Sequence, residues 1–221
     1  IALGVGYVYA NTTIGIANIS VPIDLTQLPN FLVESGIVNY DSSTEDQFAQ
    51  RINVVSTQVA KSIAVKYPNI HVTGIESELA SEFIAHYNVP AAESREALDS
   101  DIDVSDVESG VPDYIMIGEL TAINAGDQKL PIESSTKYSD VYNINAAVSY
   151  RIIRMSDQKV VGGFTAAGQA GGVQFLSDKN TIPNYNTAEL IQSASDSLLA
   201  SILSQFDAQV TSGKFEFESQ I

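Results

Sequence analysis

The stretch "YNINAAVSYRIIRMSDQKVVGGFTAAG", Tyr142–Gly168, holds two apolar segments separated by a short polar one. From Tyr142 to Ile153, large apolar residues alternate with polar or small ones, which is the period of a strand with one buried face. Ser156–Lys159 has the composition of a turn, and Val160–Gly168 returns as a second strand. We predict two adjacent antiparallel strands, and the residues expected to face helices are Tyr142, Ile144, Val148, Tyr150 and Ile152.

Five glycines lie between Gly162 and Gly172, a density that is typical of phosphate-binding loops. Gly163 and Gly168 have the spacing of a Walker loop, but Gln169 and Ala170 stand where lysine and a hydroxyl residue are needed. A dinucleotide fingerprint needs a strand before it and a helix after it, whereas this segment follows a turn and is expected to enter a loop. We predict a strand crowded by a neighbouring backbone, and no bound nucleotide or other cofactor.

Amphipathic helices are indicated in three places. Ser42 and Glu45 have capping-box spacing, and Pro68 ends the apolar face that follows, which is made by Phe48, Ile52, Val55, Val59, Ile63 and Tyr67. Glu76–Tyr87 is a second helix. A third begins near Asn186 and Glu189, with an apolar stripe of Ile191, Ala194, Leu198, Ile202 and Phe206.

The other segments are predicted as strands or loops. Further strands are expected at Ala2–Ala10, Ile70–Gly74, Tyr114–Ile123 and Lys214–Ile221. The segment 126–137 is predicted to be loop. With 221 residues the chain suits a single domain, 1–221, with a long loop or insertion at about 11–42 that has room for one short strand, and an acidic loop at about 88–112.

The formal net charge of −16 excludes some classes of partner. An acidic surface repels phosphate backbones, so nucleic acid is not an expected partner. The chain has no cysteine, which excludes disulfides, thiolate catalysis and cysteine metal sites. It has no apolar run of about 18 residues, so no transmembrane helix is expected. Because it begins at Ile1 and not at Met, we expect upstream residues, where a signal peptide or a lipidated cysteine would stand.

Candidate site residues are few. Asp99, Asp101 and Asp103 match the first ligands of a calcium loop, but Val104 and Gly110 occupy the positions of its glycine and its final glutamate. We predict a solvated acidic loop, with a weak calcium site that includes Glu108 as the alternative. His71 and His86 have no third ligand in view, and are expected on a strand edge and on a helix flank. Glu119 is expected to face solvent from a half-buried strand.

Several segments resemble the superfamily of the curli-export lipoprotein and the penicillin-binding-protein activator lipoprotein. The similar segments are "YVYANTT" (7–13), "IHVTGIESELASEF" (70–83), "VPDYIMIGELTAI" (111–123), the hairpin quoted above and the closing helix at Thr187–Phe206. The match covers roughly three quarters of the chain in the order of its elements. It departs from the family at Gly74 and Ile75, where a basic residue is usual, and in the longer segment from Ile14 to Tyr40.

The resemblance implies an α/β (α+β) fold: a mixed, mainly antiparallel sheet with amphipathic helices packed on it. It implies a periplasmic or outer-membrane-associated accessory protein that docks to protein partners of the cell envelope, and no catalytic residues. Pore activity is not expected, because no membrane-hairpin strands are evident.

A non-enzymatic envelope module, possessing no metal or cofactor, is therefore the leading functional hypothesis. The alternatives are a self-assembling structural protein of the cell surface and a hydrolase whose site is formed by residues distant in sequence. We expect a homo-oligomer in which two apolar segments add to a sheet edge, and the interface candidates are Ile14, Ile16, Ile19, Phe215 and Phe217. The alternative is that both segments fold back on their own domain.

Overall fold

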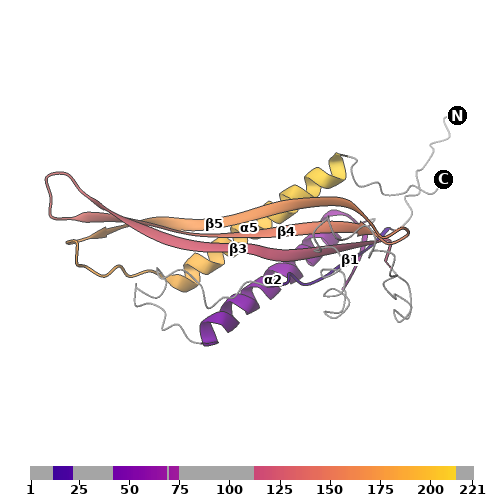
Figure 1. Cartoon of the computed structure of the whole chain (residues 1–221), viewed down its shortest axis with the longest axis horizontal. Helices are drawn as coiled ribbons and strands as arrows, with labels where there is room; N and C mark the ends of the chain where they lie inside the picture. Colours follow the sequence, from indigo (N-terminus) through magenta and orange to yellow (C-terminus); the bar gives the residue numbers. More distant parts are fainter. Residues whose placement is uncertain (1–11, 22–41, 69, 75–111, 213–221) are drawn as a thin grey trace, which may run out of the picture.

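The computed structural model describes residues 12–21, 42–68, 70–74 and 112–212 (Figure 1). These residues form a five-stranded mixed sheet in the order β2-β1-β3-β4-β5, with two helices packed on it. The elements are β1 (Thr12–Ile16), α2 (Ser42–Lys66), β2 (Ile70–Gly74), β3 (Tyr114–Pro131), β4 (Tyr138–Arg154), β5 (Lys159–Leu176) and α5 (Thr187–Thr211). The predicted fold class is confirmed.

The sheet combines a short parallel part with a long antiparallel part. β1 lies between β2 and β3 and is parallel to both, and α2 makes the connection from β1 to β2. A parallel pair needs such a crossover, which explains the helix between the two strands. β1 also lies inside the segment 11–42 that we predicted as loop, so it is the short strand for which that segment has room.

The predicted hairpin is confirmed. β4 and β5 pair in an antiparallel ladder from Tyr138↔Leu176 to Arg154↔Lys159, with one irregularity between Ile152 and Ile153. Arg154 closes the turn by donating to both carboxylate oxygens of Asp157 at 3.0 and 2.7 Å. These hydrogen bonds lower the pKa of Asp157 to about 2.

The antiparallel strands are longer than the sequence predicts. We expected 126–137 to be loop, but β3 continues to Pro131 and β4 begins at Tyr138. We expected the second strand of the hairpin to end at Gly168, but β5 continues to Leu176. Glycine, aspartate and proline are poor strand formers. Here every residue from Gly126 to Pro131 nevertheless has a ladder partner on β4, so tertiary pairing overrides local propensity.

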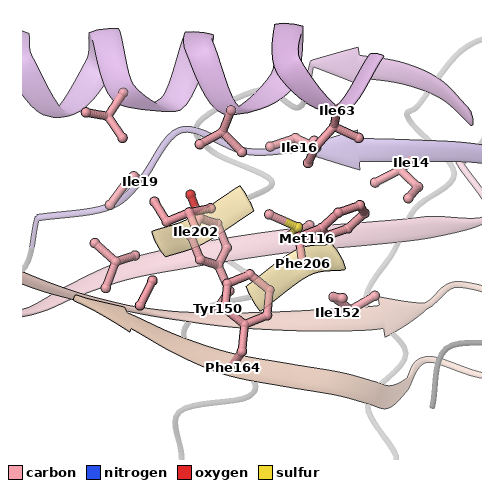
Figure 2. Close-up of a cluster of buried hydrophobic side chains, with 14 of the residues drawn as sticks. Ile14, Ile16, Ile19, Ile63, Met116, Tyr150, Ile152, Phe164, Ile202 and Phe206 are labelled. Atoms are coloured by element: carbon pink, nitrogen blue, oxygen red, sulfur yellow. The ribbon is translucent and has the colours of Figure 1, made fainter. Parts of the chain in front are cut away.

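The core lies between one face of the sheet and the two helices, and Figure 2 shows its centre. Both predicted helices within the described residues are confirmed. α2 ends at Lys66, two residues before Pro68. At the N-terminus of α5 the Asn186 side chain accepts a hydrogen bond from Glu189 N at 3.2 Å. Residues of the predicted apolar faces are buried: Ile52, Val55, Val59 and Ile63 on α2, Ile191, Ala194, Leu198, Ile202 and Phe206 on α5, and Ile144, Val148, Tyr150 and Ile152 on β4. Ile153, which was predicted on the alternate side of β4, is buried as well.

The glycines of β5 have a packing role where α5 crosses the strand. A Cβ atom placed on Gly168 would lie 2.5 Å from both Ala194 O and Leu198 N, which are backbone atoms of α5. Only a residue without a side chain lets the helix approach this closely. The expectation that neighbouring backbone crowds this strand is therefore confirmed at Gly168.

Gly168→Ala is expected to lower the free energy of unfolding by about 1–3 kcal/mol, because a helix backbone cannot move aside as a side chain can. Gly126→Ala is the matched control, since nothing lies within 4 Å of its added Cβ. Urea denaturation followed by circular dichroism measures both variants. Equal stability of the two variants would show that α5 does not pack closely on Gly168.

The Tyr150 ring is the other close contact of the core. It lies against Gly118 on β3 and its centroid is 5.2 Å from that of Phe164 on β5. Its hydroxyl is buried and has no hydrogen-bond partner among the described residues. Burial raises the pKa of Tyr150.

Tyr150→Phe is expected to leave stability unchanged or to raise it by up to about 1 kcal/mol, because it removes a buried hydroxyl without a partner. Tyr150→Ala should lower stability by about 3–5 kcal/mol, because it removes the ring from the core. Thermal and urea unfolding test this pair of variants. A clear loss of stability in Tyr150→Phe would show that the hydroxyl has a partner.

Three predicted elements lie outside the described residues: the strand Ala2–Ala10, the helix Glu76–Tyr87 and the strand Lys214–Ile221. The acidic loop at about 88–112 also lies almost wholly outside them.

Candidate interaction surface

The outer parts of the three long strands form a projecting sheet that we call the arm. It consists of residues 122–131 of β3, 138–147 of β4 and 167–176 of β5. Figure 1 shows that its far end extends beyond the ends of both helices. The arm exposes one face of the sheet, and its opposite face is covered in part by α5 and by the segment 177–186 that leads into this helix.

The covered face of the arm has its own small core. Residues of the sheet and of the first turns of α5 meet there, namely Ile144, Tyr185, Leu190, Ile191 and Ala194. The ring of Tyr185 lies against that of Tyr142, with centroids 4.6 Å apart. Gln174 holds the connecting segment in place: its amide nitrogen donates to Asn184 O at 2.7 Å and its amide oxygen accepts from Asn184 N at 2.9 Å.

A carboxylate is buried at the centre of this small core. Asp140 is fully buried on β4 and accepts a short hydrogen bond from the Tyr185 hydroxyl through Oδ2. The same hydroxyl lies 3.4 Å from Asp127 Oδ2. Oδ1 of Asp140 has no hydrogen-bond partner among the described residues. Burying a carboxylate that has one oxygen unsatisfied disfavours its charged form.

Burial raises the pKa of Asp140 above its ordinary value of 3.8. The hydrogen bond from Tyr185 and the charge of Lys129 act in the opposite direction, while the neighbouring carboxyl group of Asp127 raises it further. Since the folded pKa is raised, the stabilisation from protonated Asp140 is complete below about pH 3.8 and is lost as the pH rises through the folded value.

As the pH falls from 7 to 4, the natural chain is therefore expected to gain stability relative to the Asp140→Asn variant. The quantity to compare is the free energy of unfolding of the two proteins. Denaturation at several pH values measures it, and Glu133→Gln in the exposed β3–β4 turn controls for the loss of one negative charge. A difference that shifts the opposite way would mean that Asp140 is stabilised as an anion.

The opposite face of the arm, which we call the outer face, carries no charged residue. Paired residues of antiparallel strands point to the same side of a sheet, so the registers define this face. It contains Ala122, Asn124, Gly126, Gln128 and Leu130 on β3, Ser139, Val141, Asn143, Asn145 and Ala147 on β4, and Ala167, Gln169, Gly171, Val173 and Phe175 on β5. An uncharged surface of this extent stands out in a chain of net charge −16.

The tip of the outer face is apolar. Leu130, Val141, Val173 and Phe175 lie in two neighbouring rows of the ladder and are between 41% and 74% exposed. Single exposed apolar side chains are ordinary on protein surfaces, but a contiguous group on a projecting sheet is typical of an interaction site.

β5 is the outermost strand on this side of the sheet. The side chains of α5 satisfy part of its outward backbone: Ala167 N donates to Ser201 Oγ at 3.2 Å and Gln169 N donates to Ser197 Oγ at 3.1 Å. By strand alternation the backbone groups of Gly171, Val173 and Phe175 point the same way. Among the described residues no hydrogen-bond partner is found for them, so the last third of β5 is an open edge.

A shallow open hollow of about 540 Å³ lies on β4 and β5 near the turn that joins them, at the end of these strands away from the arm. Its lining includes Ser149, Arg151, Gly163 and Thr165, and contains no carboxylate or imidazole. Among the described residues no group of three or more histidines and carboxylates is placed to bind a metal ion. Neither of the two described helices contains a stretch apolar enough to cross a membrane.

The structure corrects part of the predicted interface. Ile14, Ile16 and Ile19 are buried in the core, where β1 is an interior strand, so they add to the sheet of their own chain and are not exposed to a partner. Phe215 and Phe217 lie outside the described residues, as do His86, Asp99, Asp101, Asp103 and Glu108. His71 is exposed on the edge strand β2, as expected. Glu119 was expected to face solvent from a half-buried strand, but it is itself half-buried, in a part of β3 whose other residues are buried.

The residues of the arm tip and the pair Asp140–Tyr185 were missed by sequence reasoning. The alternation that predicts β4 continues upstream, with Tyr138 and Asp140 on one face and Ser139 and Val141 on the other. Val173 and Phe175 likewise alternate with Gln174. Extending the period in both directions is the signal that would have found the tip.

The chain matches no family model, and no curated protein matches it in sequence. Similar solved structures include a neuraminyllactose-binding hemagglutinin homolog from Helicobacter pylori, with a TM-score of 0.46 and 6% identity over 91% of this chain and 84% of that chain. The hypothetical protein CT253 from Chlamydia trachomatis has a TM-score of 0.41 and 11% identity, over 91% of this chain and 99% of that chain.

A third similar structure is the lipoprotein GNA1162 from Neisseria meningitidis, with a TM-score of 0.34 and 11% identity over 91% of this chain and 99% of that chain. All three TM-scores lie below 0.5, and these likenesses therefore carry no argument about this chain.

Proposed function

We propose that this protein is a non-enzymatic binding module that works in an assembly of the cell envelope, and that the arm is the element by which it binds protein. The observation that carries the proposal is the outer face: fifteen positions on three strands without a charge, in a chain of net charge −16, with an exposed apolar tip.

The composition of this face is that of a protein-binding surface. The centres of protein interfaces are depleted in charged residues and enriched in aromatic ones, because burying a charge without a partner costs free energy. Phe175 supplies an exposed aromatic side chain, and the asparagines and glutamines of the middle rows supply donors and acceptors. The small core on the covered side, which includes Tyr185, packs against the sheet and supports the outer face from behind.

The envelope setting is supported by the sequence resemblance to the superfamily of the curli-export and penicillin-binding-protein activator lipoproteins. Members of that superfamily act through envelope partners, which agrees with a surface made for binding. A periplasmic or outer-membrane-associated location, with a lipid tether upstream of Ile1, is the specific form of the proposal.

A photo-reactive phenylalanine analogue at position 175 tests the proposal in the organism that makes the protein. The same analogue at Val65 is the control, because Val65 is 83% exposed on α2 and lies away from the arm. We expect a discrete cross-linked protein product from position 175 that position 65 does not yield. Indistinguishable products from the two positions would overturn the role of the arm.

A further inference from the structure

We propose that the partner of the arm is a second copy of this chain, joined by antiparallel pairing of the two β5 edges across a two-fold axis. This inference rests on the proposed function, because it names the partner of the same surface. It starts from the open edge at Gly171, Val173 and Phe175.

Within the described part of the chain, the edge lacks the devices that natural proteins use against strand addition. Exposed edge strands are usually guarded by lysine, proline, bulges or a covering element. From Val160 to Leu176 β5 contains no charged residue and no proline, and its ladder with β4 is regular from Gly162 onward. The serines of α5 cover Ala167 and Gln169, so pairing is confined to the last third of the strand.

Charge favours a second copy over other partners. Two chains that each carry −16 repel one another wherever their acidic surfaces meet. Pairing of the two β5 edges sets the uncharged outer faces side by side in one sheet. An equally acidic chain can therefore bind at this edge without charge repulsion between the outer faces. A basic partner would instead gain from contacts with acidic surface elsewhere, and nothing on this face would attract it.

The spacing of side chains on β5 defines a self-complementary register. With Val173 on the two-fold axis, the outward groups of Val173 in each copy bond to each other, and Gly171 lies opposite Phe175 of the other copy. Because Gly171 has no side chain, the Phe175 ring of the other copy meets no opposing side chain there. Both copies then present their outer faces on the same side of one continuous sheet.

The apolar tips become contiguous in this arrangement. Val173 and Phe175 of one copy meet their counterparts, and Leu130 and Val141 of each chain flank them in the same two rows of the ladder. The exposed apolar group of one chain is thus extended by that of the other, so both the backbone edge and the side chains are used at one interface.

Disulfide trapping tests the register, because the chain has no cysteine of its own. In Val173→Cys the two thiols would lie on residues about 5.5 Å apart at Cα, within the usual reach of a disulfide. Val160→Cys is the matched control: it is an exposed valine on the same strand, far from its counterpart in the proposed dimer. We expect mild oxidation of the full chain to link 173 efficiently and 160 only slightly.

Analytical ultracentrifugation of the full chain tests the affinity. We expect the natural chain to dimerise, and Val173→Lys to raise the dissociation constant by about a hundredfold or more, since it places two like charges opposite each other at the axis. Val160→Lys should leave the constant unchanged. Circular dichroism and thermal unfolding check that both variants fold.

Three outcomes would overturn the inference: a monomer at all concentrations, equal linking at 173 and 160, or an undiminished dimer in Val173→Lys. They do not decide the proposed function. Photo-cross-links from position 175 to other proteins would sustain that function and reject self-pairing, whereas a product of twice the chain mass containing only its own peptides would support both.

Discussion

The structure depends on the complete pairing of β4, which has a neighbour on each side along its whole length. A strand paired on both edges has no backbone group left to satisfy, so its residues differ only in the face they occupy. Val148, Tyr150 and Ile152 turn toward the helices and are buried. In the arm, the alternate residues of β4 form the exposed outer face, whereas Ile153, near the β4–β5 turn, is buried on that side of the sheet.

The helices are positioned on that ladder by small residues. α5 approaches β5 at Gly168, where there is no room for a side chain between strand and helix, and the ring of Tyr150 on β4 lies over Gly118 on the neighbouring strand β3. The same helix provides Ser197 and Ser201 to the outward amides of β5. α5 therefore performs two tasks: it closes the core, and it covers the outward edge of β5 as far as Gln169.

Charge is distributed unevenly between the two faces of the arm. The covered face holds Asp127, Lys129 and the buried Asp140, and the outer face holds none. Burying Asp140 beneath Tyr185 costs free energy, and its raised pKa is the sign of that cost. An acidic chain that keeps one broad surface free of charge retains a place at which another acidic surface can bind without repulsion.

The sequence by itself determined the hairpin around Ser156–Lys159 and the two described helices, because period two and period 3.6 are local signals. The mixed sheet was expected only from the resemblance to a known superfamily. The sequence also showed that the glycines of β5 mark a crowded strand. The arm, by contrast, was decided by tertiary structure. Gly126–Pro131 has the composition of a loop and becomes strand because β4 offers a partner at every position.

The candidate site was likewise beyond local patterns. Ile14, Ile16 and Ile19 are as apolar in sequence as Val173 and Phe175, yet the first three are buried in or just after an interior strand and the last two are exposed on an edge strand. Which apolar residues are covered depends on strand order, and strand order is set by pairings between segments distant in the chain. For the same reason Asp140 and Tyr185, which are 45 positions apart, reveal their contact only in the folded molecule.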